Sequence, residues 1–271
     1  MIQQGSAYWL KNQDSQNSHF NLLELASTQR AITNYVKILT GREIPVEFVD
    51  PRGDSMTDGE SIEIASRISH KNVDEVVGLA LHEASHCILT DFKVLKKLNN
   101  VILHHSKYKH LFPNKDHVYL LTNFMEDRRI DDFVYNSAPG YKAYYQSMYE
   151  SSFFNENINR GLKSNQYRTE TWESYIFRII NIFNPNSDLD ALHNLRKIYD
   201  IIDLNHINRL KSTRDSIEVA MEIVDIVRAS IIVERMINED GFDQSVLEKS
   251  HKTEGEKNDI SKEKIKNALM D

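Results

Sequence analysis

The strongest constraint in this chain is a pair of histidines inside a segment whose apolar residues repeat at helical spacing. Asn72 and Glu75 have the spacing of a capping box, which places the start of a helix near residue 72. Because residues four apart lie on one face of a helix, His82 and His86 are predicted to point in the same direction. The apolar repeat consists of Val73, Val76, Val77, Ala80, Ala84, Cys87 and Ile88.

Glu83 directly follows the first histidine, so residues 82–86 read His-Glu-Ala-Ser-His, the pattern HExxH. Two imidazoles on one helix face can bind one metal ion, and a glutamate between them can act as general base on bound water. The alternative is a helix whose two histidines simply lie on its polar side. Since the full pattern rarely arises by chance, we favour a metal site with His82 and His86 as ligands and Glu83 as the base.

A catalytic zinc site of this type requires a third protein ligand and an open fourth position. The residue six positions after His86 is Phe92, so the longer motif with a third histidine is absent. The single cysteine, Cys87, excludes a disulfide framework or a multi-cysteine zinc site. It is turned about 100° from His86 around the helix and fits the apolar stripe, which predicts a core thiol.

Carboxylates for the third position stand in a second predicted helix, at residues 117–135. Glu126 lies on one face of that helix, and Asp127 and Asp131 share another. One carboxylate can bind the metal while a second holds a ligand histidine by its outer ring nitrogen. The alternative is an acidic helix face that pairs with the neighbouring arginines. Taken alone, this segment is better explained as an acidic helix face. Taken together with the HExxH pattern, it is better explained as a source of metal ligands.

The remaining sequence predicts an α+β chain with few strands and many helices. Residues 44–49 and 61–65 have strand patterns, and the residues between them have loop chemistry. From about residue 244 the chain is polar with charges of both signs, which predicts a frayed tail or a linker. Further helices are expected at 21–40, 141–154, 169–183, 188–202 and 207–237.

Composition limits the classes of partner and the compartment. The 33 basic and 40 acidic residues give a net charge of −7, which argues against a dominant nucleic-acid surface. No stretch of about 18 apolar residues is present, so we expect no transmembrane helix. The first residues lack the pattern of a signal peptide. We therefore expect a cytoplasmic protein, located in the host cytoplasm or the virion if a phage encodes it.

A tyrosine stripe follows the second motif helix. Its hydroxyls are candidate donors to the charge that develops in a transition state, although tyrosines at this spacing are more often core residues. The members of this stripe are Tyr141, Tyr144, Tyr145 and Tyr149.

A histidine cluster lies between the two motif helices. Its irregular spacing and its lysine-rich surroundings favour a solvated segment over a second metal site. The members of this cluster are His104, His105, His110 and His117.

The order of the motifs resembles a known family. HExxH at residues 82–86 is followed by Thr90-Asp91-Phe92, then by Asn123-x-x-Glu126-Asp127-x-Arg129-Ile130, then by Pro139-Gly140-Tyr141. This order is similar to the zincin-type metallopeptidases linked to von Willebrand factor A domains. Relatives occur in bacteria and phages and are sometimes described as cobalt-chelatase-subunit-like. The resemblance covers residues 44–149 and includes Thr57-Asp58-Gly59.

This resemblance implies a gluzincin-like site that holds one Zn²⁺ per chain. The implied ligands are His82, His86 and Glu126, and the implied base is Glu83. Asp127 and Asp131 together reproduce the carboxylate–xxx–aspartate spacing of gluzincins, so Asp127 is the alternative ligand and both aspartates are candidates for orienting a ligand. The resemblance also implies that strand 61–65 is the sheet edge beside the cleft, where a peptide would add by main-chain hydrogen bonds.

We therefore expect residues 1–155 to form the metallopeptidase core, residues 156–245 a helical region that completes or covers the cleft, and residues 246–271 a polar tail or linker. The expected reaction is zinc-dependent hydrolysis of peptide bonds in a peptide or protein substrate. The alternative is a catalytically silent zincin-fold binding or assembly protein with structural zinc. The intact Glu83 argues against that alternative. A von Willebrand factor A-type or assembly protein is the candidate partner that the resemblance adds.

Overall fold

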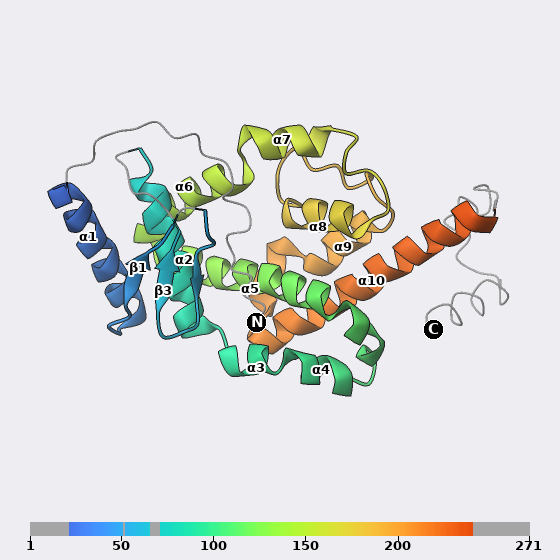
Figure 1. Cartoon of the computed structure of the whole chain (residues 1–271), viewed down its shortest axis with the longest axis horizontal. Helices are drawn as coiled ribbons and strands as arrows, with labels where there is room; N and C mark the ends of the chain where they lie inside the picture. Colours follow the sequence, from blue (N-terminus) through green and yellow to red (C-terminus); the bar gives the residue numbers. More distant parts are fainter. Residues whose placement is uncertain (1–21, 51, 66–70, 241–271) are drawn as a thin grey trace.

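The computed structural model describes residues 22–50, 52–65 and 71–240, and the expected tail at 246–271 lies outside these ranges. The chain is α+β and mostly helical, with one small sheet near α1 and α2 (Figure 1). The strands are β1 (Val46–Phe48), β2 (Met56–Thr57) and β3 (Ile62–Ile64). The α-helices are α1 (Leu22–Thr40), α2 (Val73–Leu89), α3 (Phe92–Lys96), α4 (Leu98–His104), α5 (Lys115–Ser137), α6 (Lys142–Phe153), α7 (Glu156–Lys163), α8 (Trp172–Ile180), α9 (Leu195–Ile202) and α10 (Thr213–Asp240). Three 3₁₀ helices join them, η1 (Lys109–Asn114), η2 (Pro139–Tyr141) and η3 (Leu204–Arg209).

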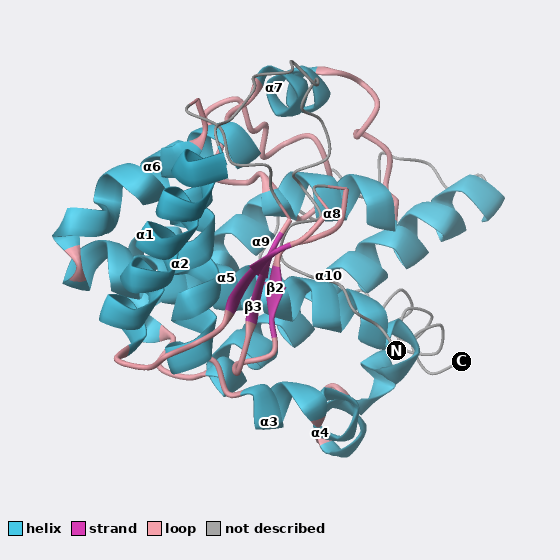
Figure 2. Ribbon diagram, turned by 60° about the vertical axis from the view of Figure 1, so that its left-hand side comes forward, coloured by secondary structure: helices cyan, strands magenta, loops and turns pink. Residues whose placement is uncertain are grey.

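The sheet has the order β1-β3-β2 (Figure 2). β3 runs parallel to β1, with Ile62 opposite Val46, and antiparallel to β2, with Ile62 opposite Thr57. The expectation that strand 61–65 forms the sheet edge is therefore wrong, because β3 is the central strand. The strand that covers it has only two residues and lies within the predicted loop, and a segment so short shows no alternating pattern in the sequence.

The predicted helix around HExxH is confirmed as α2, and it is buried on every side. All residues from Val76 to His86 are buried, because α1, α5, α6 and β3 pack against this helix. Its apolar stripe meets Ile62 and Ile64 of the sheet, both fully buried. The histidines therefore face another helix, α5, and not solvent.

Gly78 allows α6 to cross α2 at close range. A Cβ at this position would overlap the backbone carbonyl of Tyr144 and would stand 3.0 Å from Cβ of Met148. Backbone atoms of a packed helix cannot move aside as a flexible side chain can. The close approach places the tyrosine stripe of α6 beside the HExxH helix, so Gly78 sets the position of one wall of the site.

Replacing Gly78 with alanine tests this packing. We expect Gly78→Ala to destabilise the fold by about 1–3 kcal/mol, since overpacking outweighs the gain in helix propensity. Gly140→Ala is the matched control, because a Cβ there meets no atom within 4 Å. Urea unfolding of both variants measures the difference, and a Gly78→Ala protein as stable as the Gly140→Ala protein would contradict the close packing.

Helix α5 belongs to two hydrophobic clusters. Its Val134 packs with α1, α2, α6 and the sheet, whereas its Leu121 and Met125 pack with α4, α8, α9 and α10. Figure 1 shows α5 crossing the centre of the molecule, with α10 alongside it. The second cluster combines residues from both sides of position 155, so the two regions expected from the sequence share one core.

The second half differs from the sequence prediction in where its helices begin and end. The expected helix at 207–237 is divided: Leu210 is extended, and α10 begins only at Thr213. Asp203, with a φ of 44°, ends α9 in the left-handed region. Helices α3, α4 and α7 were not expected, because each has eight residues or fewer and too few turns to show a period.

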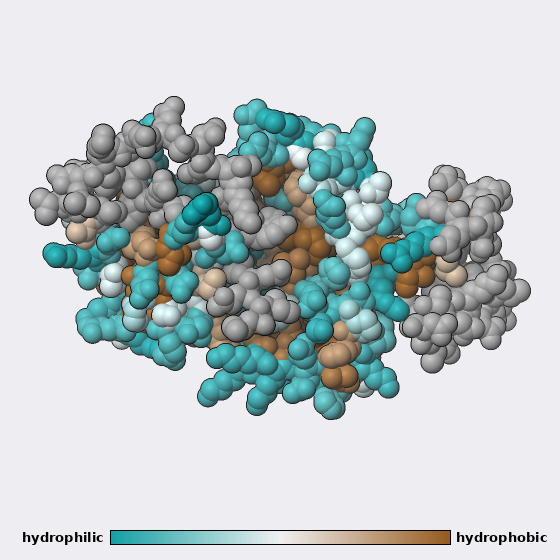
Figure 3. All heavy atoms as spheres, in the orientation of Figure 1, coloured by the Kyte–Doolittle hydropathy of each residue, from teal (hydrophilic) through white to brown (hydrophobic). Residues whose placement is uncertain are grey.

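The face of the molecule that is turned to the viewer in Figures 1 and 3 is mainly hydrophilic, with hydrophobic patches over its centre and along α10 (Figure 3). Within residues 22–50, 52–65 and 71–240, every helix is too short or too polar to cross a lipid bilayer.

Candidate metal centre

Helix α2 presents His82 and His86 side by side. The centroids of the two imidazole rings are 4.9 Å apart and the rings are perpendicular. His82 is 4% exposed and His86 is 5% exposed. The sequence prediction that both rings point to one place is confirmed, and that place is the interface between α2 and α5.

Asp127 of α5 completes a cluster with the two histidines. Its Oδ1 lies 3.1 Å from Nε2 of His86 and 3.7 Å from Nε2 of His82. Ligand atoms held about 2.0–2.1 Å from a tetrahedral ion stand about 3.3–3.4 Å from one another. The two distances to Asp127 are therefore close to the spacing that one small cation requires, and all ligand atoms of the cluster lie within 4.8 Å of one another.

The other ring nitrogen of each histidine is fixed by a hydrogen bond. Nδ1 of His82 lies 2.7 Å from Oδ1 of Asp131, and Nδ1 of His86 lies 2.9 Å from Oγ1 of Thr90. Outer partners of this kind set the tautomer and the orientation of a metal-binding imidazole. The expected role of Asp131 as a residue that orients a ligand agrees with this geometry.

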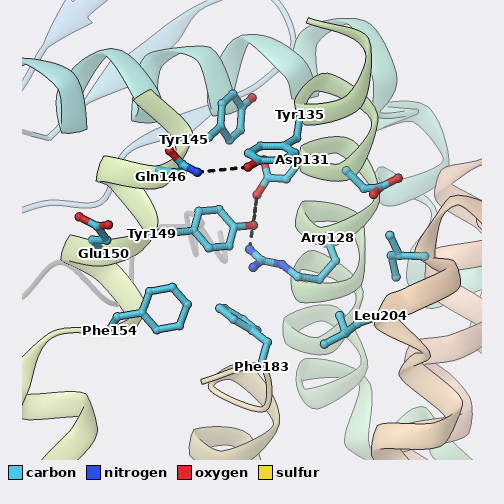
Figure 4. A pocket seen from close by; sticks show the side chains of 12 residues that line it. Arg128, Asp131, Tyr135, Tyr145, Gln146, Tyr149, Glu150, Phe154, Phe183 and Leu204 are labelled. Atoms are coloured by element: carbon cyan, nitrogen blue, oxygen red, sulfur yellow. Dashed lines mark hydrogen bonds and ion pairs between the residues drawn. The ribbon is translucent and has the colours of Figure 1, made fainter. Parts of the chain in front are cut away.

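Asp131 is held in turn by the next residues outward. Tyr149 of α6 donates from its hydroxyl to Oδ2 of Asp131 over 2.6 Å, as Figure 4 shows. Nη2 of Arg128 lies 3.5 Å from the same oxygen. Tyr149 therefore acts on the site through Asp131, because its hydroxyl is already committed to that carboxylate. Of the other three tyrosines of the stripe, Tyr145 shares a hydrogen bond of 3.0 Å with Ser85 of α2. Tyr141 and Tyr144 contact Tyr35 of α1.

Glu83 lies between the two histidines on α2 and is 1% exposed. Together with Asp127 and Asp131 it surrounds His82 with negative charge. Burial opposes a charged His82, but these three carboxylates outweigh it and raise the pKa of His82 to about 10. Carboxylates that favour a protonated imidazole favour a metal cation for the same electrostatic reason, and the ion and the proton compete for Nε2.

Glu126 is oriented differently from its neighbour Asp127. Its carboxylate accepts two hydrogen bonds from Arg129, at 2.6 and 3.0 Å, and one each from Thr213 and Ser216 of α10, both at 2.8 Å. It is 1% exposed and does not belong to the cluster formed by the histidines and Asp127. The structure therefore brings Asp127 to the two histidines, and not Glu126, which the sequence analysis had preferred as third ligand. The physical reason is that position 126 faces α10 while position 127 faces α2.

The Glu126 network is a structural crosslink. Burial tends to raise the pKa of Glu126, but the bonds from Arg129, Ser216 and Thr213 outweigh this effect and lower it. Nη2 of Arg129 also donates to the carbonyl of Leu89 at the end of α2, over 2.6 Å. The network thus joins α2, α5 and α10 immediately beside the cluster. Thr213 and Ser216 lie 87 and 90 residues downstream of Glu126, so no local pattern could have linked them to it.

An isosteric pair of variants separates the two acidic neighbours. We expect Asp127→Asn to weaken metal binding by more than about 100-fold, beyond the range typical of outer-shell changes, and to keep the fold. We expect Glu126→Gln to retain the metal but to lose about 3–5 kcal/mol of stability, because it leaves Arg129 buried without its counter-charge. Metal titration and urea unfolding of both variants measure these effects. If Glu126→Gln loses the metal with its fold intact while Asp127→Asn keeps the metal, Glu126 is the third ligand after all.

Three members of the histidine cluster, His105, His110 and His117, contact other elements, whereas His104 is exposed and bonds to the carbonyl of Asn100 within α4. Nε2 of His105 lies 3.0 Å from Glu218, and Nε2 of His110 lies 2.7 Å from Asp225, both on α10. His117 stacks on Trp172. Among the described residues, only His82, His86 and Asp127 form a group of three or more side chains with metal-ligand spacing. The expectation of a solvated segment therefore holds for His104, whereas the other three histidines are partly buried against neighbouring elements.

Comparison of the chain with protein-family models, with curated proteins and with solved structures finds no significant match. Arguments about function therefore rest on the site.

Proposed function

We propose that the chain is a zinc-dependent metallopeptidase with a zincin-like core, and that His82, His86 and Asp127 hold the ion. The observation that supports this proposal is the convergence of two imidazoles and one carboxylate, all buried, with Glu83 on the same helix. The outer bonds to Asp131 and Thr90 add to it, because such bonds are the usual companions of metal-binding histidines.

Zinc fits the donor set. Two imidazole nitrogens and one carboxylate oxygen are the protein ligands of a large class of catalytic zinc sites, which leave the fourth position for water or substrate. Thiol ligation is not expected, since Cys87 bonds to Thr57 and to the carbonyl of Glu83, on another face of α2. Iron(II) also binds two histidines and one carboxylate, so metal analysis has to identify the ion.

The residues divide the work of peptide hydrolysis. A bound zinc supplies Lewis acidity, which makes water a better nucleophile and stabilises negative charge on the substrate carbonyl. Glu83 accepts the proton from the attacking water and can pass it to the leaving amine. Asp131 and Thr90 keep the two imidazoles in place while charge develops, and Tyr149 holds Asp131.

The spacing of the two aspartates adds to the gluzincin-like interpretation. In the sequence, Asp127 and Asp131 already had the carboxylate–xxx–aspartate pattern of that group, although Glu126 was preferred as ligand. With Asp127 in the cluster and Asp131 on Nδ1 of His82, each aspartate has the role that the pattern implies. The substrate would be a peptide or protein, and an assembly partner remains a proposal that rests on the family resemblance.

A silent protein with structural zinc is the second candidate, and one observation favours it. All three proposed ligands are less than one-tenth exposed, as closed structural sites are. Glu83 distinguishes the two functions, because a structural ion needs no base.

Replacing the base tests the proposal. We expect Glu83→Gln to keep one zinc per chain and to reduce cleavage of unfolded casein or a quenched peptide library by at least about 100-fold, since general-base catalysis typically contributes about 10²–10⁴-fold. Glu60→Gln is the control, because the Glu60 side chain is 82% exposed. Undiminished turnover in Glu83→Gln would exclude Glu83 as the base. No turnover in zinc-loaded wild type would favour the structural alternative.

A further inference from the structure

A pocket of about 550 Å³ opens on the far side of Asp131 from His82. It lies between α5, α6 and η3, and its lining is mostly aromatic and aliphatic, including Tyr149, Phe154, Phe183 and Ile207. Its size is typical of sites for small ligands. None of the proposed metal ligands lines it, so the pocket is separate from the metal position and one carboxylate away from it.

Arg128 is the buried cation of this pocket. Its side chain is 6% exposed, and its guanidinium carbon lies 4.9–5.5 Å from the centroids of four aromatic rings. Those rings belong to Phe124, Tyr149, Phe153 and Phe183. Figure 4 shows the guanidinium directed between Tyr149 and Phe183. The faces of these rings attract the cation but are not hydrogen-bond acceptors of the ordinary kind, so the N–H groups of Arg128 need other partners.

Those edges are not satisfied. Nε and Nη1 of Arg128 have no hydrogen-bond partner among the residues that the structure describes. Nη2 approaches Asp131, at 3.5 Å, but that carboxylate already serves His82 and Tyr149 at 2.7 and 2.6 Å. Asp131 and Asp127 both favour the charged form of Arg128, but neither accepts a hydrogen bond from Nε or Nη1. Buried N–H groups of a cation are costly to leave without acceptors, so a ligand that brings a carboxylate to them would supply what the protein lacks.

Charge at the pocket also limits what enters. Asp132 and Glu150 line it together with Asp131, so the carboxylates outnumber Arg128. A ligand with two or more negative charges would be repelled by them. A ligand with a single carboxylate on an apolar or aromatic group fits the charge and the lining of the pocket. Its carboxylate would pair with Arg128, and its apolar part would pack on Phe154 and Phe183.

We propose that this pocket binds a monocarboxylate with an aromatic or large aliphatic body, with the carboxylate on the N–H edge of Arg128. The chemistry is shared by small organic acids and by the free C-terminal residue of a peptide. The site is distinct from the metal centre, and the proposal does not require that the chain be a peptidase.

Binding of matched acid and amide probes tests the proposal. Calorimetry or ligand-observed NMR on the full chain would compare 3-phenylpropionate with 3-phenylpropanamide, and N-acetylglycylphenylalanine with its C-terminal amide. We expect each acid that binds to do so at least about 10-fold more tightly than its amide, as for a hydrogen bond to a charged group. Tighter binding of 3-phenylpropionate would indicate a small organic acid as the ligand, and tighter binding of N-acetylglycylphenylalanine would indicate a peptide C-terminus. Phenylsuccinate, a dicarboxylate, should bind more weakly than 3-phenylpropionate.

Two variants divide the contributions. Arg128→Met should remove the preference for acid over amide, whereas Phe154→Ala should weaken acid and amide by similar factors and keep the preference. Phe133→Ala is the control for the second variant, because Phe133 is 52% exposed and does not line the pocket. If Arg128→Met fails to fold, the acid preference of wild type and of Phe154→Ala still decides the question. Equal binding of acid and amide, or no binding of either acid at millimolar concentration, would overturn the proposal.

Discussion

The contact between α2 and α5 is the interaction on which the rest of the structure depends. It brings His82 and His86 against Asp127 and Asp131, four ionisable groups that are all buried. Buried charges persist only where partners and hydrogen bonds compensate for lost hydration. Here each histidine has a carboxylate partner across the interface, and these carboxylates raise the pKa of His82 despite its burial. A cation at the centre satisfies the same groups.

Contacts on two sides of the α2–α5 interface hold the two helices in position. On one side Gly78 lets α6 approach closely, which delivers Tyr149 to Asp131. On the other side Glu126 binds Arg129 and the start of α10, and Arg129 reaches the end of α2. Glu126, which the sequence offered as a ligand, is thus part of a crosslink beside the cluster of His82, His86 and Asp127. The same arrangement leaves Arg128 among aromatic rings at the back of Asp131, where the proposed carboxylate pocket begins.

The sequence predicted those parts of the fold and site that depend on local pattern. HExxH in an apolar repeat located α2 and the two histidines that meet on one of its faces, and the i, i+4 aspartates pointed to the second helix. Local pattern could not predict the role of a residue where that role depends on a partner far away in the sequence. Glu126 and Asp127 are adjacent and chemically alike, and only the presence of Thr213 and Ser216 on α10 makes one of them structural. Likewise β2 exists only through its pairing with β3, so its two residues read as a loop.

X-ray absorption at the zinc edge, on full-length protein loaded with one equivalent of zinc, tests the central claim most directly. The account predicts stoichiometric binding, with nitrogen and oxygen neighbours at about 2.0–2.2 Å and an imidazole scattering pattern for two histidines. A sulfur neighbour at about 2.3 Å would mean that Cys87 binds the ion. That result, or failure to bind zinc at neutral pH, would contradict the assignment of His82, His86 and Asp127 as a metal centre.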